Sequence, residues 1–187
     1  MILLDIGHGY DTPGKRTPAL FHGFHINEWQ IAMNFAMATW RRLKEANLQV
    51  MFVNTTILDM ELSKRTEYIN SFGDGDVKVC ISFHANAGQG DGFLQANGFE
   101  LLHYPSPKST AYAARLLEFL KPQLLRFEMR DRGLKPRMDL ALFNRTKPTC
   151  LMIEAGFMNS HHDYEQLVNP QYQDAIGQAV TAFCLQL

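Results

Sequence analysis

The sequence predicts a single α/β domain, in which a twisted, mostly parallel or mixed sheet is covered by helices on both faces. Short apolar runs at residues 1–6, 77–83 and 149–154 are typical of strands that are buried on both faces. Segments with helical periodicity separate these runs. Strands that alternate with helices form α/β sheets with right-handed crossovers, so the order of the elements indicates this class.

The composition is that of an ordinary globular protein. The chain has 187 residues, of which 46% are hydrophobic and 20% are charged, so we assign residues 1–187 to one domain. A net charge of −1 creates no field that would draw the chain to nucleic acid, and we expect no nucleic-acid partner. No apolar run is long enough to cross a membrane. Cys80, Cys150 and Cys184 lie far apart in apolar runs and are expected to be reduced and buried.

Residues 1–9 join the first strand to a histidine that lies between two glycines. Gly7 and Gly9 permit a sharp turn and a close approach of the backbone, so His8 is displayed at the carboxyl end of the strand. Open α/β sheets bind ligands at that edge. The connection that follows, residues 10–23, is long for a compact domain, which favours a role in a site.

The first helix is predicted from Asn27 to about Ala46. Asn27 is a favourable N-cap, and Gln30 three residues later completes a capping-box pattern. Glu28 lies in the first turn, where a carboxylate stabilises the helix dipole. The alternative is that Glu28 binds a metal beside His8.

The middle of the chain repeats the pattern of a strand that ends in histidine. A strand at 49–53 and a helix at 63–71 precede the central strand at 77–83, which delivers His84. After a loop that reaches residue 97, a strand is predicted at 99–104, with His103 as a strand residue and not a ligand. A helix follows from Ser106 and Pro107 to about residue 125.

The last third of the chain supplies a carboxylate at the end of a strand. Residues 126–137 hold five basic and two acidic residues, which indicates a solvated loop or a patch that holds a carboxylate-bearing substrate. We expect a short strand at 140–143, then a strand at 149–154 that ends in Glu154. His161 and His162 are predicted on an exposed turn, and a final helix begins at Asn169 and Pro170.

Three of these strands are expected to deliver their polar residues to one edge of the sheet. There His8, His84 and Glu154 would meet, within reach of Glu28. Two imidazoles and one carboxylate are a ligand set typical of catalytic zinc sites. His22 and His25 are alternative candidates for the histidine ligands. Bound zinc activates water and polarises a carbonyl, and Glu154, partly desolvated, would serve as the base. Asp5 is a candidate hydrogen-bond partner for one of the imidazoles.

In order and combination, these residues resemble the zinc-dependent N-acetylmuramoyl-L-alanine amidases of the amidase-3 type, including phage endolysin catalytic domains. The resemblance covers nearly the whole chain. It is carried by Asp5–Gly9, Thr12–Arg16 with Pro18, Glu28 with Asn34, Asp59, Leu62, Arg65, Asn70, Ser82–Ala87, Gly98–Glu100, Arg132–Lys135, Pro148, Ile153–Phe157, Asp163 and Leu167. Tyr10 and Ser160 depart from the family pattern, in loops and not at the ligands.

The resemblance implies the site and the reaction. His8, Glu28 and His84 would bind one Zn²⁺, and Glu154 would be the catalytic glutamate in cleavage of the amide between N-acetylmuramic acid and L-alanine of peptidoglycan. Asn86, Arg132 and Lys135 are expected to contact the substrate. The alternatives are a zinc carboxypeptidase or other peptidase acting on wall peptides, and a wall-binding relative without activity.

The resemblance also bears on the biological setting. The Thr12–Arg16 run is more similar to the phage or prophage branch than to the exported cell-division branch. We expect a monomer without a separate wall-binding domain or membrane span. It would be made in the cytoplasm without a signal peptide and act on the cell wall after release; a trimmed exported domain would look the same.

Overall fold

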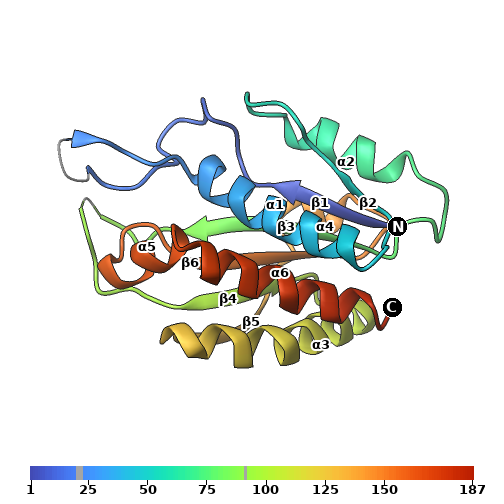
Figure 1. Cartoon of the computed structure of the whole chain (residues 1–187). Helices are drawn as coiled ribbons and strands as arrows, with labels where there is room; N and C mark the ends of the chain where they lie inside the picture. Colours follow the sequence, from blue (N-terminus) through green and yellow to red (C-terminus); the bar gives the residue numbers. More distant parts are fainter. Residues whose placement is uncertain (20–22, 91) are drawn as a thin grey trace.

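A computed structural model describes residues 1–19, 23–90 and 92–187 (Figure 1). Over these residues the chain builds one six-stranded sheet with the strand order β2-β1-β3-β6-β4-β5. The strands are β1 (Ile2–Ile6), β2 (Val50–Phe52), β3 (Val79–Asn86), β4 (Phe99–His103), β5 (Asp131–Pro136) and β6 (Cys150–Phe157). The central position of β3 and β6 explains why their sequences are apolar runs with little alternation.

The sheet is mixed, as the sequence predicts. β2, β1, β3 and β6 run parallel to one another, whereas β4 pairs with β6 in the antiparallel direction. β5 is parallel to β4. The carboxyl ends of β1, β3 and β6 therefore share one edge of the sheet with the beginnings of β4 and β5. We call this edge the catalytic edge.

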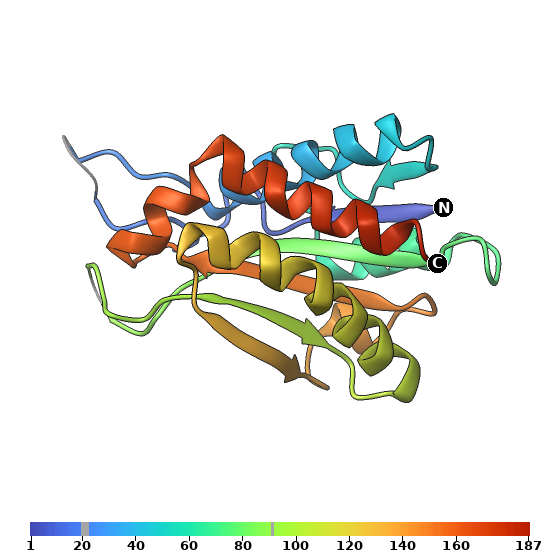
Figure 2. The ribbon, with the colours of Figure 1, turned by 60° about the horizontal axis from the view of Figure 1, so that its bottom comes forward.

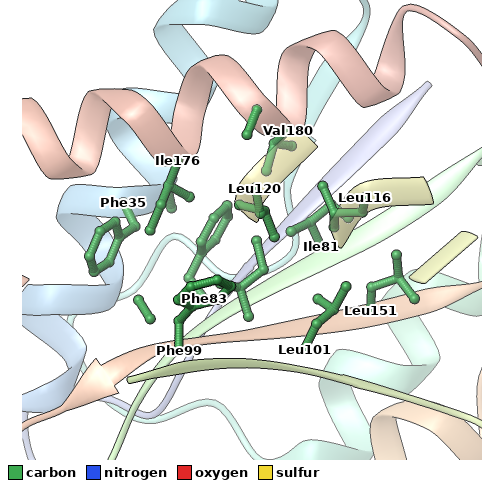
Figure 3. Packing of buried hydrophobic residues seen from close by; sticks show 14 of the residues in the cluster. Phe35, Ile81, Phe83, Phe99, Leu101, Leu116, Leu120, Leu151, Ile176 and Val180 are labelled. Atoms are coloured by element: carbon green, nitrogen blue, oxygen red, sulfur yellow. The ribbon is translucent and has the colours of Figure 1, made fainter. Parts of the chain in front are cut away.

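Helices cover both faces of the sheet. α1 (Glu28–Glu45), α3 (Pro107–Leu124) and α6 (Pro170–Cys184) pack on one face, with α6 between the other two (Figure 2). α2 (Leu62–Asn70) and α4 (Ala141–Asn144) lie on the opposite face, and α5 (His161–Leu167) follows β6. Figure 3 shows the larger core, where helix side chains meet strand side chains: Phe35, Leu116, Leu120, Ile176 and Val180 against Ile81, Phe83, Phe99, Leu101 and Leu151.

The predicted helix starts are confirmed by their caps. The backbone N–H of Asn27 donates to Gln30 Oε1 over 3.1 Å at the start of α1. Ser106 Oγ accepts from the N–H of Ser109 at the start of α3, and Asn169 Oδ1 accepts from that of Gln171 at the start of α6. These bonds satisfy amide groups that have no partner within the helix.

Three local predictions are wrong. Residues 131–136 form the edge strand β5 and not a loop, because Leu134 packs on the larger core while the charged residues of the strand remain partly exposed. Residues 140–143 were predicted as a strand, but α4 forms there and buries Leu142 and Phe143 in the smaller core. His161 and His162 begin α5 instead of lying on a turn, since Ser160 Oγ accepts from the N–H of Asp163.

Both chain ends lie at the edge opposite the catalytic edge (Figures 1 and 2). The terminal ammonium of Met1 donates to the carbonyl of Asp76 over 2.9 Å, and Lys78 Nζ donates to the carbonyl of Leu187 over 2.8 Å. The turn at residues 76–78 thus contacts both ends. Among the helices of the described residues, none has the length and apolar character that a membrane crossing requires.

Candidate active site

The catalytic edge brings together the four residues that the sequence singles out. His8 follows β1 directly, Glu28 is the first residue of α1, and His84 and Glu154 lie near the ends of β3 and β6. Both strands extend beyond their predicted ends, to Asn86 and Phe157. His84 therefore lies within β3, whereas the sequence predicts it just after the strand; Glu154 lies within β6, as expected, but not at its end.

His8, Glu28 and His84 converge on one point. Each offers one ligand atom, and these atoms all lie within 4.8 Å of one another. His8 Nε2 is 3.2 Å from Glu28 Oε2, and His84 Nδ1 is 3.0 Å from Glu28 Oε1. The two imidazole rings are nearly perpendicular, with centroids 5.1 Å apart. The prediction that these three side chains meet, although they are distant along the chain, is confirmed.

The backbone around His8 has an unusual conformation. His8 has a φ of +59°, a left-handed value that is uncommon for a residue other than glycine and is often found at functional sites. A Cβ on Gly7 would lie 2.6 Å from the ring of His84, and one on Gly9 would lie 2.1 Å from the backbone nitrogen of Asp59. Glycines are therefore required on both sides of His8, as the sequence suggests.

Glu28 carries the negative charge of this cluster. Its side chain is 2% exposed, and burial alone would raise its pKa. The nearby imidazoles of His8 and His84 outweigh burial and hold the pKa of Glu28 well below the usual range. Burial also favours the neutral form of His84, but the hydrogen bond between its ring N–H and the accepting carboxylate of Glu28 raises the pKa of His84 overall. An ionised carboxylate between two imidazoles fits a divalent metal such as zinc.

The buried carboxylate of Glu28 supports this fit. Glu28 Oε2 is buried and has no hydrogen-bond partner among the described residues. Burial without a partner is costly for a carboxylate oxygen. The basic side chains that approach it are those of His8, with Nε2 at 3.2 Å, and Lys15, with Nζ at 3.8 Å. A metal ion at this point would satisfy the oxygen. These three residues therefore fit the Zn²⁺ ion that the family resemblance implies.

Glu154 lies beside the cluster on the neighbouring strand. It is directly opposite His84 in the β3–β6 register, and paired residues project to the same face of the sheet. Its Oε2 is buried without a hydrogen-bond partner. Burial is the main cause that raises the pKa of Glu154 to about 7. The charge of His84 would lower this pKa, but the negative charges of Glu28 and Glu100 oppose that effect. A carboxyl group with this pKa can accept and return a proton near neutral pH.

Arg65 is a structural residue of the site whose role sequence reasoning missed. Its side chain is 3% exposed and donates to Asp5 Oδ1 over 3.1 Å and to the carbonyl of His8 over 3.0 Å. The remaining oxygen of Asp5 accepts from Ser82 Oγ over 2.6 Å. Asp5 thus binds Arg65 and Ser82, where we had expected an imidazole, and the ion pair fixes the backbone that carries His8.

Two of the three predicted substrate contacts lie next to Glu154. Asn86 Nδ2 donates to Glu100 Oε1 over 3.0 Å, and Arg132 Nε donates to Glu100 Oε2 over 2.8 Å. Glu100 is opposite Glu154 in the β4–β6 register. Lys135 lies farther along β5, beside Leu102 and away from the catalytic edge. Glu100 is a site residue that the sequence could indicate only through its place in a motif.

Among the described residues, the other histidines lie outside the cluster of His8, Glu28 and His84. His25 Nδ1 is 2.7 Å from the carbonyl of Thr17, and His103 Nδ1 is 2.8 Å from that of Tyr104. His161 stacks on Phe93, at a centroid distance of 3.8 Å. His22, the other rival ligand, lies outside the described residues.

A cavity of about 280 Å³ adjoins the cluster on the sheet face that α2 and α4 cover. His8, His84, Arg65, Leu142 and Met152 are among the residues that line it. The volume is at the lower end for a small-molecule site. The cavity can accept one end of a substrate next to the ligand cluster, while the rest of a larger substrate must lie outside.

Comparisons with known proteins agree with this geometry. A model of the N-acetylmuramoyl-L-alanine amidase family, of the amidase-3 type, matches residues 2–185. The search of curated proteins finds no match.

Solved structures share the fold. The catalytic domain of the amidase CwlV from Bacillus (Paenibacillus) polymyxa var. colistinus superposes with a TM-score of 0.82 at 19% identity, over 99% of this chain and 96% of that one. An N-acetylmuramoyl-L-alanine amidase from Clostridium difficile 630 gives 0.83 at 20% identity, over 99% and 94%. The catalytic domain of an endolysin targeting Clostridia difficile gives 0.71 at 23% identity, over 99% and 96%. The family match over nearly the whole chain identifies this protein as a member of the amidase-3 family, a peptidoglycan hydrolase of the N-acetylmuramoyl-L-alanine amidase class.

Proposed function

We propose that this amidase is zinc-dependent, that His8, Glu28 and His84 hold one Zn²⁺, and that Glu154 is its general base. The observation that carries the proposal is the convergence of the three ligand atoms within 4.8 Å, with Glu154 opposite His84 on the next strand. The bond to be cleaved is the amide between the lactyl group of N-acetylmuramic acid and L-alanine. When bound, zinc would activate water and polarise the carbonyl of this amide.

The role of Glu154 follows from its burial and charge. With a pKa of about 7, its carboxylate accepts a proton from the attacking water at neutral pH. The same carboxyl group then returns the proton to the nitrogen of L-alanine as the C–N bond breaks. Without this transfer the nitrogen would leave as an amide anion, which is a poor leaving group.

Glu100, Asn86 and Arg132 form a hydrogen-bonded group next to this base. Arg132 lies over the ring of Phe157 at 4.9 Å and is held there by Glu100. The amide of Asn86 is fixed by the same carboxylate. We propose that this group orients the substrate beside Glu154, in line with the contacts expected of Asn86 and Arg132.

The rival peptidase function has less support from the structure. It needs a free cation that can hold the terminal carboxylate of a peptide. Two of the five basic residues in the 126–137 segment are paired with carboxylates: Arg132, which lies next to Glu154, with Glu100, and Arg137 with Asp139. Both guanidinium groups already bind carboxylates within the chain.

The decisive experiment measures the new amine and the metal together. Purified peptidoglycan is digested, and newly formed N-termini are labelled and identified, with metal content measured on the same samples. We expect L-alanine N-termini, loss of activity with a chelator, and recovery with Zn²⁺. Glu154→Gln should keep one Zn²⁺ and lose roughly 10²–10⁴-fold in rate. The exposed Glu67 on α2 provides the control variant Glu67→Gln, which should keep full activity.

Other outcomes would contradict specific parts of the proposal. Full activity of Glu154→Gln would exclude the base role. Release of terminal amino acids in place of L-alanine N-termini would favour the peptidase. Wall binding without any new amine would favour the inactive relative.

We further propose a phage or prophage origin and a lytic role for a monomeric enzyme. The Thr12–Arg16 run and the fold shared with an endolysin catalytic domain support this setting. Such an enzyme would be made in the cytoplasm and reach the wall after release. Expression in a host should then cause lysis only when the membrane is permeabilised. Lysis of intact cells without permeabilisation would contradict this, and sedimentation would test the monomer.

A further inference from the structure

A second hollow lies at the same edge of the molecule and shares no lining residue with the cavity beside the ligand cluster. Its volume is about 630 Å³, more than twice that of the first cavity. We call it the aromatic groove and define it by Phe24, Ile26, Phe93, His161, Tyr164 and Glu165. Large exposed apolar surfaces on a monomer usually mark a binding site.

The groove is built by the three segments that follow β1, β3 and β6, the strands that lead to His8, His84 and Glu154. Phe24 and Ile26 lie in the connection from β1 to α1, Phe93 lies in the connection from β3 to β4, and His161, Tyr164 and Glu165 lie on α5 after β6. Figures 1 and 2 both show these three segments gathered at the end of the molecule farthest from the termini. Ile26 is only two residues before Glu28, so the same connection contributes to the groove and leads into the ligand cluster.

Aromatic stacking holds part of the groove in a fixed arrangement. The rings of Phe93 and His161 are parallel within 15°, with centroids 3.8 Å apart. Tyr164 meets Phe93 edge to face at 6.5 Å. Phe24 leaves 71% of its surface exposed. Aromatic rings offer a large apolar contact area at a low cost in side-chain entropy.

Hydrogen bonds connect the groove to the strand that carries Glu154. Asn159, in the turn after β6, accepts from the N–H of Gly88 over 2.9 Å and donates to the carbonyl of Gly88 over 3.0 Å. The N–H of Leu94 donates to the carbonyl of Asn159 over 2.6 Å. The bond at Leu94, the residue after Phe93, thus ties the aromatic side of the groove to the turn that follows β6.

The charge of the residues that line the groove indicates which component of peptidoglycan it can bind. Lysine and arginine are absent from the described residues that line it, and Glu165 is its single acidic residue. Stem peptides carry charged carboxylates and amines, and wall phosphates favour arginine or lysine. The glycan strand is a neutral polymer of amino sugars, whose pyranose rings present an apolar C–H face and polar edges. Aromatic rings match the C–H face, while Tyr164, His161 and Glu165 can meet the hydroxyl groups.

We propose that the aromatic groove binds the glycan strand of peptidoglycan and so places the lactyl amide over the ligand cluster. This inference rests on the amidase function and adds the sugar polymer as a second recognised element. The first cavity is too small for more than one end of the substrate, so a polymer must find its further contacts outside it. The groove supplies those contacts.

The test uses a probe that the amidase cannot cleave. A β-1,4-linked tetramer of N-acetylglucosamine contains the sugar backbone but neither a lactyl group nor a peptide. We expect the wild-type protein to bind it in a calorimetric or NMR titration. Phe24→Ala and Phe93→Ala should each raise the Kd by roughly tenfold, the size expected for loss of one stacked ring. Phe93→Trp should restore binding to Phe93→Ala.

Two further readouts separate binding from folding. Phe24 is largely exposed, so Phe24→Ala is expected to fold even where Phe93→Ala does not. Tyr104, an aromatic residue at the end of β4 on the opposite edge, provides the control Tyr104→Ala, which should leave the Kd unchanged. On polymeric peptidoglycan, the groove variants should raise KM with little change in kcat.

The proposal has clear contrary outcomes. A tetramer that fails to bind, or that binds both groove variants as tightly as the wild type, would overturn it. A wild-type dimer that Phe24→Ala converts to a monomer, without any effect on tetramer binding, would show that the groove is instead an interface between copies. Release of L-alanine N-termini is measured separately, so failure of glycan binding leaves the amidase function intact.

Discussion

Glu154 is expected to make the metal-free protein less stable as pH rises. Its pKa is about 7 in the folded protein against an ordinary value of 4.5, and burial is the main cause. Between these two pH values the folded state keeps a proton that the unfolded state has released. The free energy of unfolding therefore decreases as pH rises through this window, and the loss is complete above the folded pKa. One pKa unit corresponds to about 1.4 kcal/mol, so the total contribution is roughly 3 kcal/mol.

Glu154→Gln removes this titration while it keeps the shape of the protonated acid. We expect the variant to match the wild type near pH 4 and to be more stable by roughly 3 kcal/mol near pH 8. Urea unfolding at several pH values, in the presence of a chelator and followed by tryptophan fluorescence, would measure this difference. Titration of most other groups cancels between the two proteins, and the exposed Glu67→Gln variant should show no such trend.

A stability difference between Glu154→Gln and the wild type that stays constant from pH 4 to pH 8 would refute the reasoning. It would mean that the carboxyl group is solvated in solution and titrates as an ordinary glutamate. The base role would then lose the physical reason given for it. Added Zn²⁺ should shrink the difference, because a nearby cation favours the ionised form of Glu154.

Three other substitutions test the framework of the site. His84→Ala should lower zinc content and stability together, since ligand loss uncouples metal binding from folding; metal analysis and thermal unfolding would show this, and unchanged zinc content would reassign the ligands. Arg65→Met should cost about 3–5 kcal/mol in urea unfolding, because it leaves the carboxylate of Asp5 buried without its cation. A cost below 1 kcal/mol would show that Ser82 alone satisfies Asp5. Gly9→Ala should destabilise by about 1–3 kcal/mol and lower zinc affinity, because its Cβ would lie 2.1 Å from a backbone nitrogen. Full stability and affinity would show that the turn can shift freely.

The sequence predicts the ligand-bearing strands well because burial on both faces leaves a clear pattern. An apolar run that stops at a histidine or glutamate is unusual, and such runs place His84 and Glu154 at the catalytic edge. The start of α1 could also be predicted from its capping residues, which places Glu28 close to His8.

Other parts of the site depend on long-range pairing that local patterns do not encode. Glu100 comes beside Glu154 only because β4 runs antiparallel to β6, and an apolar strand has the same pattern in either direction. Arg65 lies on an amphipathic helix, where a charged residue is normally solvated, and nothing local shows that it is buried against Asp5. The apolar run at 140–143 is too short for its pattern to distinguish a strand from the single helical turn of α4.

The turn at residues 76–78 contacts both chain ends, which makes this domain suitable for circular permutation. A short linker could join Leu187 to Met1 without crossing the hydrolytic face, since both ends are already adjacent to one turn. Circular permutants opened elsewhere on the surface should fold. Cargo or a surface tether attached at either end would leave the reactive side of the molecule pointing outward, toward its polymer.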